Sequence, residues 1–197
     1  MKKLIVILVA GFFAAQFMGC EQGPNTASEA KIDQVARGKY LVSTSACHDC
    51  HSPKLVGPGG MPIPDTTRLL SGHPAELPYP IWTPEDLQKR NGVTIASPML
   101  TAWAGPWGVS FTANLTPDTS TGIGEWTEDT FIRAIRTGKH QGYPNGRDIL
   151  PPMPWDVYRN FTDQDLKAIW AYLRSLPPVK NQVPFPVPPG QPMSMAN

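Results

Sequence analysis

Cys47-His48-Asp49-Cys50-His51 is the stretch of this sequence that decides how the rest of the chain must fold. Two cysteines at this spacing, followed directly by a histidine, form the C-x-x-C-H motif to which a c-type haem is attached. The two thiols can form thioether bonds with the two vinyl groups of one porphyrin, and the imidazole of His51 then serves as the proximal iron ligand. The motif therefore predicts one covalent haem c, held by Cys47, Cys50 and His51.

Three other uses of the two cysteines are a redox-active dithiol, a structural disulfide and half of a zinc site. A tetrahedral zinc site needs further ligands, and the chain offers only His48, His73 and His140 as additional nitrogen donors, without a second cysteine pair. A thioredoxin-type C-x-x-C is expected among alternating strands and helices, and no such alternation surrounds residue 47. We therefore favour the haem.

The N-terminal residues 1–19 indicate export. Two lysines precede an uncharged, largely apolar run over residues 4–18, which is too short for a confident membrane span and is typical of a secretory signal. Gly19-Cys20 matches the end of a bacterial lipobox, in which the cysteine becomes the acylated first residue of the mature protein. An ordinary signal peptide, with Cys20 as a bystander, is the alternative. We expect an exported, periplasm-facing protein that is anchored to a membrane through a lipid on Cys20.

Composition bounds the rest of the fold. Without residues 1–19 the chain has 178 residues, enough for one domain with a core. Its 15 basic and 16 acidic residues give a formal charge of about −1, so the sequence offers no basic face for nucleic acid. The 23 prolines and 17 glycines require long loops. We expect a mainly α fold in which long Pro/Gly-rich loops surround one haem.

The chain divides into three segments after the signal. Residues 20–31 are small and polar and are expected to form a flexible tether. Residues 32–178 form the haem domain, within which 53–110 is an extended loop insertion with many Pro-containing pairs. Residues 179–197 form a Pro-rich tail that should be extended rather than packed.

Helical signal begins at about residues 34–44 and runs straight into the haem motif, with Ala36 and Tyr40 four residues apart. A short helix is plausible over residues 83–89 of the insertion, where Thr83 is the N-cap and a proline follows it. No strand pattern of any length is visible.

Two later helices are better defined. Thr127 caps the first, which ends at Gly138, and Thr162 caps the last, which ends before the two prolines at 177–178. Their expected buried residues are Phe131, Ile132 and Ile135 in the first, and Leu166, Ile169, Trp170, Leu173 and Leu176 in the second.

The second axial ligand of the iron decides between an electron carrier and an enzyme. Met153 is the candidate, because three prolines with fixed φ stiffen its loop and lower the entropy cost of holding a weak thioether ligand. The alternative is that Met153 only fills the core. The weaker rivals are Met61 and Met99 in other proline-containing loops, Met193 and Met195 in the tail, and His73 and His140, which we expect at the surface.

A series of short motifs resembles the class I c-type cytochromes. In order they are ARGKYLV at 36–42, CHDCH at 47–51, NLTPD at 114–118, TGIG at 121–124, WT at 126–127, RTG at 136–138, PPMP at 151–154 and LRSLPP at 173–178. The similarity covers roughly residues 34–52 and 111–178. These segments most resemble the haem modules of the cytochrome subunits of membrane-bound alcohol and gluconate dehydrogenases. Those subunits carry three C-x-x-C-H motifs, whereas this chain has one.

The resemblance implies that Met153 is the distal ligand. It also implies a helical fold in which the first and last helices cross, so that the helix holding Gly38 and Tyr40 packs on Trp170 and Leu173.

We therefore expect a single-haem electron carrier, not an enzyme, that serves membrane or periplasmic redox partners such as a dehydrogenase or a terminal oxidase. The alternative is a haem enzyme whose open distal site reacts with peroxide or a small nitrogen oxide. A haem-based sensor is a weaker option, because no signalling module is attached. Trp103 and Trp107 in the insertion either cover the haem edge and donate to a propionate or, as we favour, are ordinary core aromatics.

Overall fold

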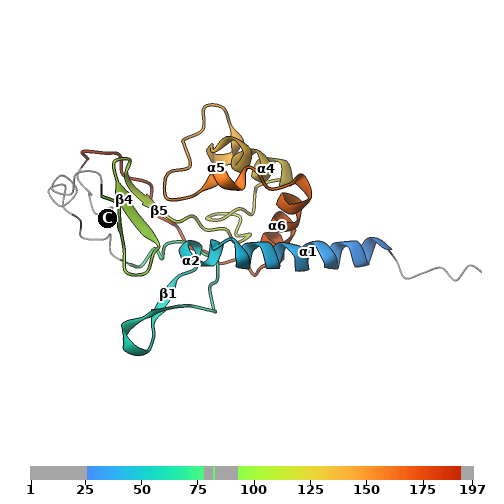
Figure 1. Cartoon of the computed structure of the whole chain (residues 1–197), viewed down its shortest axis with the longest axis horizontal. Coiled ribbons are helices and arrows are strands. Elements are labelled where there is room, and N and C mark those ends of the chain that lie inside the picture. The colour runs from blue at the N-terminus through green and yellow to red at the C-terminus, as the bar shows by residue number, and fades with distance from the viewer. Residues whose placement is uncertain (1–25, 78–81, 83–92, 192–197) are drawn as a thin grey trace, which may run out of the picture.

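The computed structural model describes residues 26–77, 82 and 93–191 of the chain. Its helices are α1 (Thr26–Thr44), α2 (Cys47–His51), η1 (Pro58–Gly60), α4 (Glu128–Thr137), η2 (His140–Gly142), α5 (Trp155–Tyr158) and α6 (Asp163–Ser175). Its strands are β1 (Lys54–Val56), β2 (Pro62–Pro64), β3 (Ile95–Ala96), β4 (Ala102–Gly105) and β5 (Gly108–Phe111). The two small sheets lie beyond the end of α1 from which α2 continues (Figure 1).

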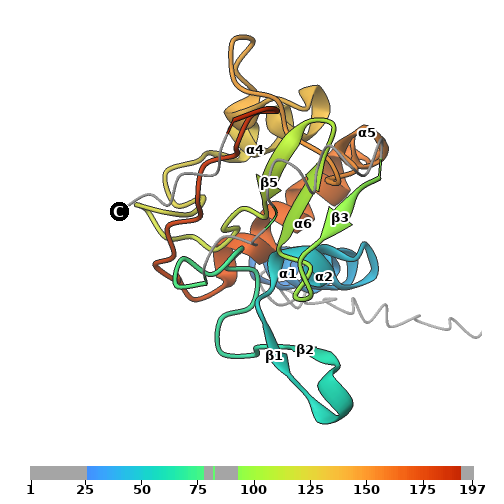
Figure 2. The ribbon, with the colours of Figure 1, turned by 90° about the vertical axis from the view of Figure 1, so that its left-hand side faces the viewer.

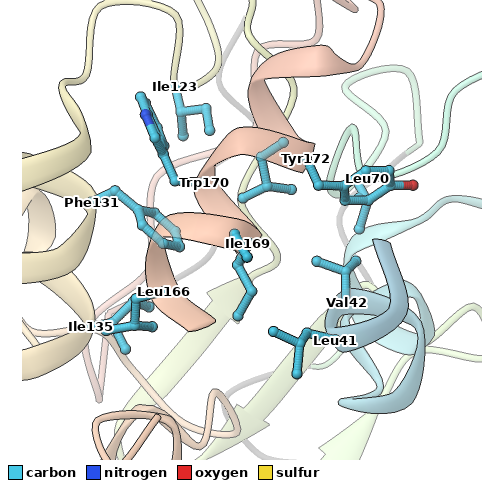
Figure 3. Close-up of a cluster of buried hydrophobic side chains, with 12 residues drawn as sticks. Leu41, Val42, Leu70, Ile123, Phe131, Ile135, Leu166, Ile169, Trp170 and Tyr172 are labelled. Carbon is cyan, nitrogen blue, oxygen red and sulfur yellow. The ribbon is translucent and has the colours of Figure 1, made fainter. Parts of the chain in front are cut away.

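Helices α1 and α6 cross in close contact, as the resemblance implied. Gly38 makes this possible, because a Cβ at this position would lie only 1.9 Å from the carbonyl oxygen of Ala168 on α6. Leu41 and Val42 are buried in the same interface and point toward Ile169 (Figure 3). The crossing therefore sets the position of the C-terminal end of α1, from which the haem motif follows.

The two residues whose spacing indicated a helix lie on the exposed face of α1. Ala36 and Tyr40 are exposed, Tyr40 by 59%, and the Arg37 guanidinium lies 5.7 Å from the Tyr40 ring centroid on the solvent side. The helix also begins at Thr26, so it takes in the last residues of the segment that was expected to be a tether. In the part of the chain that the structure describes, no helix has the length and apolar character to cross a bilayer.

The caps of the two later helices are confirmed. The Thr127 and Thr162 hydroxyls each accept a hydrogen bond from the backbone N–H three residues on, both at 3.1 Å. Gly138 ends α4 in the left-handed conformation, with φ of 67°, which glycine adopts without strain.

Side chains of α1, α4 and α6 meet in one hydrophobic core (Figure 3). The Phe131 ring stacks on Trp170 with centroids 5.6 Å apart. The buried members are Leu41, Val42, Leu70, Ile123, Phe131, Ile135, Leu166, Ala168, Ile169, Trp170, Tyr172 and Leu173, and the expected Ile132 and Leu176 are only partly buried against them.

The expectation of no strands is wrong. The insertion contains the β1–β2 hairpin and a sheet of order β3-β4-β5, all antiparallel. Each strand has only two to four residues, too few for the alternation of apolar and polar residues to be recognised in the sequence. The helix expected over residues 83–89 lies outside the described residues.

The Pro-rich tail packs against the domain, contrary to expectation. Val187 pairs with Val109 of β5 through two backbone hydrogen bonds of 2.8 and 2.9 Å. Asn181 is buried, and its amide donates to the carbonyls of Ser71 and His73 at 2.6 and 2.9 Å. The extended tail can therefore pack against the domain, because the Asn181 side chain supplies hydrogen bonds to the carbonyls that it covers.

Candidate haem-binding site

The motif residues form their own short helix. Ala46, in the left-handed conformation with φ of 57°, separates α2 from α1 and redirects the chain. Cys47 and Cys50 are both free and partly buried, and Cys47 packs against the hydrophobic core. Because residues three apart on a helix are neighbours, the two thiols lie on one side of α2.

Burial keeps both thiols neutral. It raises the pKa of Cys47 to about 11, and it also raises the pKa of Cys50, with a further contribution from Asp49. A redox-active dithiol needs a lowered pKa, since the thiolate is the attacking species. The environment of this pair is therefore unlike that of a redox dithiol and is compatible with sulfurs that end up in thioether bonds.

The His51 imidazole is held in one orientation and one tautomer. Its Nδ1 lies 2.8 Å from the carbonyl oxygen of Ala113, and because a carbonyl only accepts, Nδ1 carries the proton. The Nε2 lone pair is then available to a metal. Burial lowers the pKa of the ring, which keeps it neutral. A carbonyl partner of this kind orients a metal-binding histidine and increases its basicity.

Residues of the insertion hold the backbone on both sides of the bond between His51 and Ala113. The N–H of Gly72 donates to the carbonyl of His51 at 2.8 Å, and the N–H of His73 donates to the carbonyl of Thr112 at 2.9 Å. Thr112 immediately precedes Ala113, and its N–H donates to the carbonyl of Thr101 at 3.0 Å. Residues 72–73 and 101–112 therefore fix the Ala113 carbonyl that holds the His51 imidazole.

His73 is buried, not exposed as expected. Its ring is 2% exposed, and burial lowers its pKa to about 4. Nδ1 lies 2.9 Å from the Thr101 hydroxyl, while Nε2 is buried without a hydrogen-bond partner. Because the N–H of Gly72 donates to the carbonyl of His51, the neighbouring His73 is held close to the C-x-x-C-H helix.

Met153 is partly buried and packs against the same hydrophobic core as Cys47. The Tyr158 hydroxyl donates to the carbonyl of Ser45 at 2.5 Å, which ties the chain after Met153 to the residue that precedes the motif helix. The Trp155 ring covers Gly138, where a Cβ would lie 2.3 Å from it. The structure thus brings the loop of Met153 and the C-x-x-C-H helix onto one core.

The rivals of Met153 differ in their surroundings. Met61 is 66% exposed and lies on the β1–β2 hairpin, which stands away from the helices. Met99 is partly buried in the turn before β4. His140 is partly buried and lies edge-on to Trp126, with centroids 5.4 Å apart. Cys20, Met193 and Met195 lie outside the described residues.

Both indoles of the insertion already have acceptors within the protein. Trp103 donates to the carbonyl of Leu100 and Trp107 donates to the Ser110 hydroxyl, both at 3.2 Å. Ser110 then donates to the carbonyl of Pro151 at 2.6 Å. Trp107 therefore supports the loop of Met153 through Ser110, and neither indole needs a propionate.

Sequence reasoning missed three residues that hold the His51 ring and the loop of Met153 in place, namely Ala113, Ser110 and Tyr158. Their partners are 62, 41 and 113 residues away, so no local pattern marks them.

The residues present fit a covalent haem. Two neutral thiols lie beside each other, the neighbouring imidazole has a free Nε2, and a thioether lies on the same core. Apolar side chains that only partly enter this core supply surface for a flat macrocycle to cover; they include Leu115, Trp126, Ile132 and Phe161.

Comparisons with known proteins agree with this geometry. The chain is 28% identical to the cytochrome c subunit of gluconate 2-dehydrogenase from Pantoea cypripedii over 193 residues, which are 95% of this chain and 33% of that protein. It is 28% identical to the fructose dehydrogenase cytochrome subunit of Gluconobacter japonicus over 167 residues, 82% of this chain and 26% of that protein. A 79-residue stretch, 40% of this chain, is 40% identical to 6% of a nicotinate dehydrogenase subunit from Pseudomonas putida.

The chain thus spans a third or less of the length of these relatives. The gluconate dehydrogenase alignment covers more of the chain than the motifs alone, since it leaves out only 5% of the sequence. The family model described as Cytochrome c matches residues 35–177, which include the C-x-x-C-H helix, the loop of Met153 and α6. The chain therefore belongs to the cytochrome c family.

Proposed function

We propose that this chain carries single electrons through one covalent haem c with His51 and Met153 as axial ligands. The observation that carries the proposal is the hydrogen bond from His51 Nδ1 to the carbonyl of Ala113, which leaves a neutral imidazole with Nε2 free for iron. The haem itself supplies reversible exchange between ferric and ferrous iron, at a potential that a thioether ligand raises relative to a second histidine.

The chain's own residues do the rest. Cys47 and Cys50 would attach the porphyrin, and the Ala113 carbonyl holds the His51 ring in one orientation, with Nε2 available to the iron. Tyr158 and Ser110 restrain the loop of Met153 from its two sides. The apolar core against which Met153 packs would limit the access of water and small ligands to the iron.

The partner we propose is a dehydrogenase, or a terminal oxidase that follows it. Relatives that cover most of this chain include cytochrome subunits of fructose and gluconate dehydrogenases. The single C-x-x-C-H motif supports one haem per chain. We propose further that the protein is exported to face the periplasm and is attached to a membrane through Cys20, because the N-terminal sequence ends in a lipobox-like Gly-Cys pair.

The test is to express the full chain with a cytochrome c maturation system. We expect mass spectrometry to give the mass of one haem, and the haem to remain after acid-acetone extraction. Cys47→Ser and Cys50→Ser should each leave one thioether, with a shifted pyridine haemochrome band, and His51→Ala should yield no stable holoprotein. Tyr143→Phe, at an exposed position, is the matched control. Freely extracted haem, or bound zinc in its place, would overturn the proposal.

A redox titration separates the carrier from the enzyme. We expect a reversible one-electron transition, no binding of carbon monoxide to the ferrous protein and no peroxidase activity. Rapid reaction of the wild type with peroxide would favour the enzyme instead.

A further inference from the structure

The β1–β2 hairpin is the most apolar exposed feature in the part of the chain that the structure describes. Residues 55–64 carry no charge. Leu55, Val56, Met61 and Ile63 are 50%, 70%, 66% and 44% exposed. Figures 1 and 2 both show the hairpin standing out from the body of the protein, on the side of α1 that faces away from α4. Burial within this fold therefore does not account for these side chains.

The base of the hairpin is fastened to the haem motif. Lys54 lies three residues after His51, and its ammonium donates to the carbonyls of His48 and Asp49 at 3.0 Å each, and to that of Ser52. The N–H of Asp65 closes the other strand with a 2.8 Å bond to the carbonyl of Pro53. The hairpin is thus attached next to the cysteines and the proximal ligand, and the charge of its only lysine is directed inward.

The outer edge of β2 is unsuited to the addition of a further strand. The N–H of Gly57 donates to the carbonyl of Met61 at 2.7 Å, so these two residues form a hydrogen-bonded pair. Such pairs alternate along an antiparallel ladder, so Leu55 and Ile63 occupy the next hydrogen-bonded position. Pro62 and Pro64 then occupy the positions whose backbone faces outward. Because proline has no N–H, the outer edge of β2 cannot donate to an added strand.

We propose that this hairpin inserts into an uncharged, apolar groove on the protein that exchanges electrons with the haem. The absence of charge over residues 55–64 matches an apolar surface and offers nothing to a charged one. A stable interface uses roughly 20–30 residues a side, whereas this hairpin offers ten. Its size therefore suits the brief contacts of electron-transfer partners. This proposal rests on the proposed function.

Two other occupants fit less well. Membrane-surface segments combine basic residues with Trp or Phe at the interface, and residues 55–64 contain no basic or aromatic residue. A second copy paired edge to edge through β2 is opposed by Pro62 and Pro64, and a contact of this size alone is too small for a stable dimer.

The test uses membranes from a strain of the source bacterium in which the gene for this cytochrome is deleted. Holoprotein carrying Cys20→Ser is added, the respiratory substrates of the bacterium are supplied, and the rate of haem reduction is measured against cytochrome concentration. We expect the double variant Val56→Asp, Met61→Asp to lower the second-order rate at least tenfold. The control Val157→Asp, Phe185→Asp adds the same charge at positions that are 61% and 81% exposed and should leave the rate unchanged.

Three measurements decide between the outcomes. Hairpin and control variants that are reduced equally fast by membranes would overturn the proposal. Binding of the Cys20→Ser protein to protein-free vesicles of phosphatidylethanolamine and phosphatidylglycerol, lost in the hairpin variant, would overturn it in favour of a lipid surface. A dimer in sedimentation velocity that the hairpin variant dissociates would overturn it in favour of a second copy.

A failure of the proposed function is distinguishable from these results. All variants should keep the c-type spectrum, the potential of the wild type and its rate of reduction by ascorbate. If the wild type lacks covalent haem or is not reduced by ascorbate, the proposed function fails and the hairpin proposal fails with it.

Discussion

Gly38→Ala tests the crossing of α1 and α6, on which the position of the haem motif depends. The added Cβ would lie 1.9 Å from the Ala168 carbonyl oxygen, 2.6 Å from its carbon and 2.8 Å from the Tyr172 Cβ. Carbon and oxygen atoms in favourable contact are about 3.3–3.6 Å apart. Two of the three contacts are with backbone, so the clash cannot be relieved by a rotamer change. The helices must move apart by about 1 Å or more.

The magnitude follows from two opposing terms. Overpacking of this kind costs about 1–3 kcal/mol or more, whereas replacing glycine by alanine within a helix favours folding by about 1 kcal/mol. We expect a net loss of about 2 kcal/mol in the free energy of unfolding, because separating the helices also loosens Leu41 and Val42 against α6. At about 2–4 °C per kcal/mol for a domain of this size, the melting temperature should fall by about 4–8 °C.

The assay is thermal and guanidinium unfolding of the holoprotein, followed by far-ultraviolet circular dichroism and by haem absorbance. Ala36→Gly is the matched control: it is exposed on the same helix and should cost only the propensity term of about 1 kcal/mol. Gly38→Val should be worse than Gly38→Ala. A Gly38→Ala protein as stable as the wild type, or more stable, would refute the close crossing.

Four further predictions address other parts of the structure. Tyr158→Phe removes the bond to Ser45 and should lower the free energy of unfolding by about 1 kcal/mol in guanidinium titrations; an unchanged midpoint would contradict the restraint. Asn181→Ala leaves two carbonyls without their amide donor and should cost about 1–3 kcal/mol in the same assay, an effect that a loosely attached tail could not produce. The pKa of His73 is about 4 in the folded protein against an ordinary 6.5, so between these pH values the unfolded chain binds a proton that the folded chain does not, and the free energy of unfolding should fall by up to about 3 kcal/mol as the pH is lowered through this range. His73→Gln should flatten this dependence, and an equally steep profile in the variant would exclude His73 as its source. Labelled fatty acid should enter the wild type but not Cys20→Ser; equal labelling, or a free N-terminus in the wild type, would contradict the lipid anchor.

Features that depend on neighbouring residues could be predicted from the sequence. The caps at Thr127 and Thr162 and the end of α4 at Gly138 were correct because a cap involves residues three or four positions apart. Four of the buried residues of α6 were also recognisable, since Leu166, Ile169, Trp170 and Leu173 recur at helical spacing, whereas the burial of Ala168 and Tyr172 was not predicted.

Features that depend on residues far away in the sequence could not be predicted. On α1 the spacing of Ala36 and Tyr40 is as helical as that of Gly38 and Leu41, and only the approach of α6 decides which face is buried. The burial of His73 depends on Thr101, 28 residues away. The packing of the tail depends on Asn181 covering carbonyls more than a hundred residues earlier.

The candidate site divides in the same way. Cys47, Cys50 and His51 lie within five residues and were predicted as a haem site from the motif alone, and the structure adds that the two thiols are neutral. The supports of the site come from the insertion, which the sequence described only as irregular. Its short strands carry Ser110 to the loop of Met153 and lead into Ala113, which holds His51.

The most direct test of the central claim is the absorption of the ferric protein near the red end of the visible spectrum. A thioether bound to ferric haem iron gives a weak charge-transfer band near the red end of the spectrum. We predict this band in the wild type and in the controls Met61→Leu and Met99→Leu, and its loss in Met153→Ala, together with a high-spin spectrum and a lower potential. A band that persists in Met153→Ala, or a wild type that already lacks it, would contradict coordination of one haem by His51 and Met153.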